Sequence, residues 1–373
     1  MSGKRLYLNA CEFPMLSDRI ITKLKQNMKH LSMNASKFYR SLFQGLCLLM
    51  IMLIAGSCHK IKDYLEPEVK ITTIAKGFAL PIGVEADQYG RIWVAEMGTG
   101  QNDGKVSVVT KDGKKHTVYT GFDSFKIDNG EIEGPGHLLI SNGVLYIVGS
   151  HSKLYKANPS SYQTGDAPKD ASTLQYENIG AFILDYDFKY KIYETHAYGI
   201  VAGDGGNIYL TDAASNAIIR RAGNGVLSVL YEFAPITNPT PVGPPQIHQV
   251  PTSLYYDGQH LLITTLTGFP FPQGKATLYK LTTGGALSVY QPGFTTLVDI
   301  VEGGRKGKLV MEHGQFGQMG FVPNSGRLIW ANGNSIKELT GGLNKPAGLK
   351  QVNDHTWYVT STGDGSLLKV TYD

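Results

Sequence analysis

The chain has 373 residues, and its Lys and Arg residues outnumber its Asp and Glu residues by four. Residues 1–57 carry a net charge of +6, whereas the remainder carries −2. A body so close to neutral argues against nucleic acid as a partner, because binding it requires a basic patch or stripe. The cysteines are Cys11, Cys47 and Cys58, so the region after Cys58 has neither an internal disulfide nor a thiolate zinc site.

Residues 1–57 are predicted to be a leader. The run LFQGLCLLMIMLIA at 42–55 follows Lys37 and Arg40, and it is short for a spanning helix but typical of the apolar part of a signal peptide. Residues 1–33 fit no part of a signal peptide, so Met28 or Met33 is an alternative start.

The leader ends in Ala-Gly-Ser-Cys, which resembles a bacterial lipobox with Ala55 in place of the usual Leu. That resemblance implies cleavage before Cys58, lipid attachment to its sulfur, and stable membrane anchoring in the cell envelope by two or more acyl chains. An ordinary signal peptide or an uncleaved anchor is the alternative. Residues 58–68 are then the lipidated cysteine and a short tether.

Residues 69–373 contain six copies of one pattern. An apolar strand crosses a Gly, Asp or Asn turn into an aromatic-aliphatic strand, and most copies continue with a third and a fourth strand. The copies begin at Pro81, Pro135, Ala197, Pro251, Leu297 and Pro346, with spacings of 54, 62, 54, 46 and 49 residues. Four strands repeated every 50 residues or so are typical of propeller blades, so we predict an all-β, six-bladed β-propeller.

The two ends of this region predict how the ring closes. The last copy stops after its third strand, SLLKVTYD, and VKITTIAKGF before the first copy has the pattern of an isolated fourth strand. We expect this N-terminal strand to complete the last blade, which leaves only short sheet edges.

Long insertions are expected on one face of the ring, because they fall between blades or between second and third strands. They occupy residues 123–134, 158–196, 234–250, 265–276 and 313–326. Loops on a rigid scaffold commonly carry function, so this decorated face is the predicted binding site. The alternative is that the insertions only cap the ring.

The third position of each first strand is expected to face the central axis. It holds Gly83, His137, Gly199, Ser253, Asp299 and Gly348, which are small except in blades 2 and 5. His137 and Asp299 are therefore candidate ligand-binding residues at opposite sides of the channel. The alternative is that both only hydrogen-bond trapped water.

Histidines and carboxylates gather in the segments assigned to the decorated face. The candidates are Glu133, His137, His151, His196, His248, Glu312 and His313. Such residues could hold calcium or zinc or act as acid and base, but their spacing matches no known ligand motif, and no catalytic signature or evident cofactor is present. Asp212 and Asn216 are expected to order a turn.

Phe269 and Phe271 are set between prolines in the insertion of blade 4. Two rigid rings in a loop favour a wall for an apolar or aromatic ligand. The alternative is that they pack on the neighbouring insertion.

The chain closely resembles the ScyD/ScyE propeller family over residues 75–373. The resemblance rests on VPTSLYYDGQHLLITTLTGFPFPQGKATLYKL, and on WVAEMGTG, EGPGHLLI, AYGIVAGDGGNIYLTDAASNAIIR and TTLVDI in the same order. It implies an extracytoplasmic six-bladed propeller and supplies no catalytic residues. Gluconolactonase-type propellers are a more distant comparison. They hold calcium with a Glu before Gly-Pro on blade 1, where this chain has Leu80, and its own Glu-Gly-Pro is at Glu133 on blade 2.

Three functions remain open at this point. The first is a monomeric, lipid-anchored propeller that binds a small molecule, a glycan or an envelope protein on its decorated face. The second is a metal-dependent hydrolase or lactonase. The third is a purely structural envelope protein, because fold alone does not decide among these functions.

Overall fold

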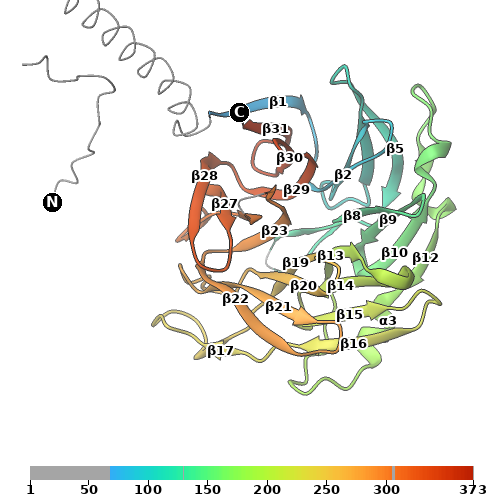
Figure 1. Cartoon of the computed structure of the whole chain (residues 1–373). Coiled ribbons are helices and arrows are strands. Elements are labelled where there is room, and N and C mark those ends of the chain that lie inside the picture. The colour runs from blue at the N-terminus through green and yellow to red at the C-terminus, as the bar shows by residue number, and fades with distance from the viewer. Residues whose placement is uncertain (1–67, 129, 305–306, 373) are drawn as a thin grey trace, which may run out of the picture. The chain divides into compact units, whose positions relative to one another are not determined.

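The structure is a computed structural model that describes residues 68–128, 130–304 and 307–372. Six four-stranded antiparallel blades surround a central axis, with a fifth strand added to the first blade (Figure 1). The prediction of an all-β, six-bladed propeller is confirmed. The predicted leader, lipobox cysteine and most of the tether lie outside the described residues.

Blades 1 to 3 follow one another along the chain, each from its innermost to its outermost strand. Blade 1 consists of β2 (Pro81–Ala86), β3 (Ile92–Glu96), β4 (Gly104–Val109) and β5 (Lys115–Phe122). Blade 2 consists of β8 (Leu138–Ser141), β9 (Val144–Gly149), β10 (Lys153–Ala157) and β12 (Gln175–Asn178). Blade 3 consists of β13 (Ala197–Ala202), β14 (Ile208–Asp212), β15 (Ala217–Arg221) and β16 (Leu227–Glu232).

Blades 4 to 6 repeat this arrangement. Blade 4 consists of β19 (Pro251–Tyr256), β20 (His260–Thr265), β21 (Ala276–Thr282) and β22 (Leu287–Phe294). Blade 5 consists of β23 (Leu297–Glu302), β24 (Lys308–Glu312), β27 (Gly326–Ala331) and β28 (Ile336–Leu343). Blade 6 consists of β29 (Pro346–Asn353), β30 (Thr356–Ser361), β31 (Ser366–Tyr372) and β1 (Val69–Lys76).

The closure of the ring agrees with the sequence prediction. Strand β1 pairs antiparallel with β31, with Val69 opposite Tyr372 and Lys76 opposite Ser366. The N-terminal strand therefore completes blade 6, so the first and last described strands of the chain lie side by side (Figure 1).

Burial explains why inner and outer strands differ in composition. All five residues of β3 (IWVAE) are buried because that strand packs between neighbouring blades. The outermost strand β16 (LSVLYE) has no buried residue, and it mixes polar with apolar side chains. The apolar cores accordingly lie between adjacent blades, as where Trp330 of blade 5 meets Trp357 of blade 6.

Glycines let the innermost strands crowd around the axis, as the repeat alignment predicts. A Cβ at Gly83 would lie 2.5 Å from the Gly136 carbonyl oxygen, and one at Gly348 would lie 2.2 Å from the Ile82 oxygen. Both distances are below any real Cβ contact, so a side chain at either position would push neighbouring blades apart.

Threonines near the ends of second strands join neighbouring blades. Thr360 accepts a hydrogen bond from the Gly348 amide (2.7 Å) and donates one to the Ile82 carbonyl of blade 1 (2.6 Å), across the closure of the ring. Thr211 makes the same two bonds between blades 3 and 4, at 2.7 and 2.6 Å.

One face of the ring carries most of the long insertions, as predicted. Residues 158–174 are the exception, because they join β10 to β12, the third and fourth strands of blade 2, and therefore lie on the opposite face. Each first strand begins opposite the end of the second strand, as Pro81 pairs with Glu96 and Leu297 with Glu312. Segments that enter a blade and loops that follow its second strand therefore emerge on the same face, called the loop face below. Three small hairpins lie on it: β6 (Phe125–Lys126) with β7 (Ile132–Glu133), β17 (Ile236–Thr237) with β18 (Gln246–Ile247), and β25 (Phe316–Gly317) with β26 (Gly320–Phe321).

The insertion at 158–196 contains more regular structure than its sequence suggests. It supplies the fourth strand of blade 2 (β12) and a strand, β11 (Lys169–Asp170), that pairs in parallel with β5 of blade 1. Helix α3 (Ile179–Asp185) follows, and its N-cap Asn178 accepts a hydrogen bond from the Ala181 amide. Single-turn 3-10 helices are η2 (Ser150–Ser152), η3 (Pro159–Ser161), η4 (Ala171–Thr173) and η5 (Asp204–Gly206). Within the described residues, no helix is long and apolar enough to cross a bilayer.

Candidate functional site

A small pocket opens on the loop face where blades 1, 2 and 3 meet, with a cavity volume of about 60 Å³. Its lining combines polar groups, glycines and apolar side chains from all three blades: Ile82, Met97, Glu133, Gly134, Gly136, Gly149, Ser150, Ser152, His196, Ala197 and Tyr198. Two of the predicted candidates, Glu133 and His196, are among these residues.

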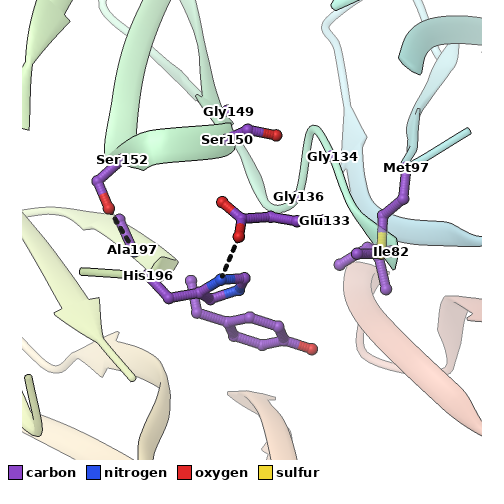
Figure 2. A pocket seen from close by; sticks show the side chains of 11 residues that line it. Ile82, Met97, Glu133, Gly134, Gly136, Gly149, Ser150, Ser152, His196 and Ala197 are labelled. Atoms are coloured by element: carbon purple, nitrogen blue, oxygen red, sulfur yellow. Dashed lines mark hydrogen bonds and ion pairs between the residues drawn. The ribbon is translucent and has the colours of Figure 1, made fainter. Parts of the chain in front are cut away.

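Glu133 and His196 form an ion pair in the pocket. The Glu133 carboxylate oxygen Oε2 lies 3.8 Å from His196 Nδ1 (Figure 2). The carboxylate is largely shielded from solvent, whereas about a third of the His196 side chain is exposed. Ile82 and Met97 lie across the pocket from the imidazole (Figure 2).

The pair stabilises the charged form of both partners. Burial raises the pKa of Glu133, but the contact with His196 and the His151 amide outweigh it and leave the pKa below its usual value. Burial likewise lowers the pKa of His196, but Glu133 and the nearby charge of Asp212 outweigh it and leave the pKa raised. His196 therefore has more imidazolium character near neutral pH than an ordinary histidine.

Hydrogen bonds from the scaffold hold both partners in place. The hairpin of β6 and β7 delivers Glu133, whose Oε1 accepts from the His151 amide at 3.1 Å. Asp212 at the end of β14 accepts from the His196 amide (2.9 Å) and from the Thr195 hydroxyl (2.8 Å). The predicted role of Asp212 in ordering its turn also holds, because its second oxygen accepts from the Ser215 amide.

The hydroxyls of both pocket serines are hydrogen-bonded to backbone groups of the scaffold. Ser150 donates to the Asp123 carbonyl at 2.9 Å, and Ser152 accepts from the Ala197 amide at 2.7 Å (Figure 2). Neither hydroxyl bonds to a histidine, so the pocket lacks the serine–histidine couple of a hydroxyl nucleophile.

Tyr198 and His137 form the inner side of the site. The Tyr198 ring lies 4.6 Å from the His137 ring and 6.2 Å from the His196 ring, measured between centroids. His137 is buried, its Nε2 has no hydrogen-bond partner, and burial lowers its pKa to about 4. Burial also raises the pKa of the Tyr198 hydroxyl, so both side chains are uncharged at neutral pH.

Asp299 lies at the axis, as predicted, but its bonds are structural. Its carboxylate accepts from the Ser253 hydroxyl of blade 4 (2.6 Å), the Ile300 amide of blade 5 (2.8 Å) and the Leu349 amide of blade 6 (2.6 Å). Burial raises its pKa to about 6 against the effect of these donors, and its charge contributes to the raised pKa of Tyr198.

The predicted aromatic residues form a second group on blades 4 and 5. Phe271 packs 4.7 Å from Phe316 and 5.2 Å from Phe321, between centroids. Phe269 lies at the edge of this group, 6.0 Å from Phe316, and remains about half exposed. The rings thus pack on the neighbouring insertion, which is the alternative reading of this loop, and only Phe269 offers much free surface.

Three other candidates stand apart from the pocket. His313 packs against Phe321, its Nδ1 lies 2.9 Å from the Pro346 carbonyl oxygen, and burial lowers its pKa to about 4. Glu312 accepts from the Thr295 amide and pairs with Arg327 at 2.6 Å. His248 is exposed, and its carbonyl accepts from the Gly268 amide.

The structure therefore brings together Glu133 and His196, and the His151 amide donates to Glu133. His137 lies behind the Tyr198 ring. The sequence prediction did not include Tyr198 or Gly136. Both occupy the second position of a first strand, where the repeat alignment has Ile82, Gly136, Tyr198, Thr252, Val298 and Ala347. A glycine and a tyrosine at the same position of adjacent blades were the signal in the sequence that could have assigned both residues to the pocket.

The described residues contain no group of three or more His, Cys, Asp or Glu side chains that could hold a metal ion. In the pocket, Glu133 and His196 supply only two side chains of these types. The geometry thus gives no specific support to the calcium or zinc site considered from the sequence.

No family profile and no curated protein matches the chain. Similar solved structures include a protein of unknown function from Bacteroides thetaiotaomicron, 11% identical with a TM-score of 0.56, covering 83% of this chain and 77% of that chain. A gluconolactonase from Xanthomonas campestris is 10% identical with a TM-score of 0.53, covering 83% and 95%. A luciferin-regenerating enzyme is 11% identical with a TM-score of 0.52, covering 82% and 95%. At these identities the similarity shows a shared propeller fold alone.

Proposed function

We propose that this chain is an extracytoplasmic binding propeller of the ScyD/ScyE type, anchored through lipid at Cys58, that binds a small molecule in the pocket of blades 1 to 3. The sequence strings that resemble the ScyD/ScyE family now have places in the fold. EGPGHLLI contributes Glu133, Gly134 and Gly136 to the pocket, and AYGIVAGDGGNIYLTD contributes Ala197 and Tyr198.

One observation carries the binding proposal. Glu133 and His196, from different blades, meet at a cavity rather than inside the packed core. An acceptor and a donor placed side by side in a concave site can orient a polar ligand. By contrast, Glu96 and Glu312, which end second strands at the loop face, are bonded within the scaffold: Glu96 to Ser107 and Lys115, and Glu312 to Arg327.

A binding role fits the chemistry better than catalysis does. The raised pKa of His196 favours the imidazolium, which is a hydrogen-bond donor and a poor general base. The hydroxyls of Ser150 and Ser152 already have backbone partners. A metal-dependent hydrolase or lactonase would need a further ligand beyond the two that the pair supplies.

Paired variants test the proposal. A library of small polar molecules is screened on the full-length protein by thermal shift, and the affinity of each hit is measured by calorimetry. We expect His196→Gln and Glu133→Gln each to weaken binding at least about tenfold, equivalent to ~1.4 kcal/mol. His248→Gln is the matched control, since this exposed histidine lies in a loop-face segment outside the pocket.

Three results would contradict the proposal. Equal affinity in the pocket variants and the control would remove the site from this pocket. Loss of binding in Phe269→Ser instead would move it to the aromatic group of blades 4 and 5. A calcium- or zinc-induced thermal shift that disappears in Glu133→Gln, with turnover of a lactone, would favour the metal-dependent hydrolase.

A further inference from the structure

One lining position of the pocket has no side chain. Gly136 lines the pocket and is the single glycine among the six second positions of the first strands. Its φ lies outside the left-handed range, so the backbone does not require glycine there. A Cβ at this position would meet nothing nearer than the Val148 carbonyl oxygen at 3.9 Å.

The neighbouring glycines have structural reasons that Gly136 lacks. A Cβ at Gly134 would lie 2.2 Å from the Met97 carbonyl oxygen, and one at Gly149 would lie 2.6 Å from the Tyr155 ring. Among the three glycines that line the pocket, Gly136 alone has open space instead of a tight contact at the position of its missing side chain. The space beside Gly136 is therefore available to a ligand.

The size of the space limits what can enter. A cavity of about 150 Å³ accepts benzene, and a water molecule occupies ~30 Å³ in the liquid. The 60 Å³ of this pocket could not enclose a six-membered ring, but it is large enough for one end group of a chain. A single carbon that carries a hydroxyl is of that size.

The charge of the pocket limits the chemistry of that group. Glu133 and His196 neutralise each other at its mouth, and Tyr198 and His137 on its inner side are uncharged. A carboxylate on the ligand would be repelled by Glu133, and an ammonium by His196. A hydroxyl both donates and accepts, so it can satisfy both members of the pair at once.

We propose that the pocket takes the terminal hydroxymethyl group of an uncharged polyol chain, with the open space at Gly136 as the seat of that group. This inference rests on the proposed function and names the class of ligand for the same site. The rest of the chain would extend from the pocket over the loop face.

Three compounds that differ only in their end groups provide the test. Sorbitol, its 1,6-diamino-1,6-dideoxy analogue and glucarate share a six-carbon hydroxylated chain whose two ends are both hydroxymethyl, both ammonium and both carboxylate groups, respectively. Calorimetry on the full-length protein is expected to give the tightest binding for sorbitol. Gly136→Ala should weaken sorbitol binding at least tenfold, because its methyl group would occupy the space beside Gly136 that the hydroxymethyl group is proposed to take.

Gly284→Ala is the matched control. Gly284 is exposed in the turn between β21 and β22, has a φ outside the left-handed range, and has room for a Cβ 3.8 Å from Thr282 Oγ1. Both variants are expected to unfold at the temperature of the unmodified protein. A difference in sorbitol binding between them then reports on the pocket and not on folding.

The outcomes separate this inference from the proposed function. Tighter binding of glucarate or of the diamine, lost in Gly136→Ala, would overturn the ligand class and leave the binding pocket in place. Sorbitol binding that is equal in both variants would overturn the seat at Gly136. Binding of none of the three would overturn the inference, while the library screen decides the proposed function independently.

Discussion

Asp299 joins three blades through one buried carboxylate. Its donors come from Ser253, Ile300 and Leu349, one on each of blades 4, 5 and 6. Three donors favour the charged form of a carboxyl, whereas burial at the axis opposes it. Burial is the larger effect and raises the pKa of Asp299 to about 6. The channel therefore contains an acid that titrates well above the usual range of aspartate.

This shift predicts how pH acts on stability through Asp299. The pKa is higher in the folded state than in the unfolded state, so between about pH 4 and pH 6 the unfolded state ionises first. The contribution of Asp299 to the free energy of unfolding is therefore fully present below pH 4. It falls by roughly 2–3 kcal/mol as pH rises through 6. Urea unfolding of the protein and of Asp299→Asn at several pH values gives the free energy of unfolding of each. The difference between the two at each pH measures the contribution of Asp299.

Asp354→Asn is the control, since Asp354 is exposed in the turn between β29 and β30. The difference in unfolding free energy between the protein and Asp299→Asn should change across pH 4–6, whereas that for the control should not. A flat difference for Asp299→Asn would mean that its carboxyl ionises normally and that the three donors fully offset the effect of burial.

Single residues also mark the limit of sequence prediction for the site. The repeat alignment placed His137 and Asp299 at the axis, because strand register is a local property of the sequence. It did not pair Glu133 with His196, because that contact depends on the path of the insertion between them. Nor did it include Tyr198 of blade 3, which lines the pocket together with Gly136 of blade 2.

At the scale of elements, the blades were predictable because each is a local meander with its own strand-turn pattern. Blade 2 is the exception, since its outermost strand β12 is only four residues long, Gln175–Asn178. That strand is charged and largely exposed, with Glu177 paired to Arg221 at 2.6 Å. Nothing in its apolar pattern distinguishes it from the loop in which it lies.

The threonine bonds between blades allow a prediction at this scale. Thr360→Val would leave the Gly348 amide and the Ile82 carbonyl without their partner, and unsatisfied buried groups cost about 1–3 kcal/mol. Valine fits sterically, because blade 2 has Val148 at the equivalent position. We expect a loss of this size in the free energy of unfolding, measured by urea titration.

Thr211→Val tests whether the closure of the ring is special. Thr211 makes the same bonds between blades 3 and 4, which are already consecutive in the chain. Thr360 bonds blade 6 to blade 1, which are linked otherwise by β1. Similar losses in both variants would show that the bonds act locally. A markedly larger loss for Thr360→Val would show that ring closure is the weaker junction.

The whole molecule depends on β1 to close the ring. Deleting residues 69–76 from the full chain would expose the edge of β31, and free sheet edges invite pairing with other chains. We expect a lower urea midpoint, a broader transition and concentration-dependent association, measured by circular dichroism and light scattering. A sharp, unchanged transition from a monomer would mean that the inner strands alone hold the ring together.

The position of β1 also determines on which face the chain enters the propeller. Val69 pairs with Tyr372, at the end of β31 away from the Ser361–Ser366 turn, and that turn lies on the loop face. The chain thus enters the propeller on the face opposite the pocket. With a lipid at Cys58, ten residues would span at most about 35 Å. Such an anchor would tether the protein by the face opposite the pocket and leave the pocket turned outward, where a solute arrives by diffusion without crossing the lipid surface.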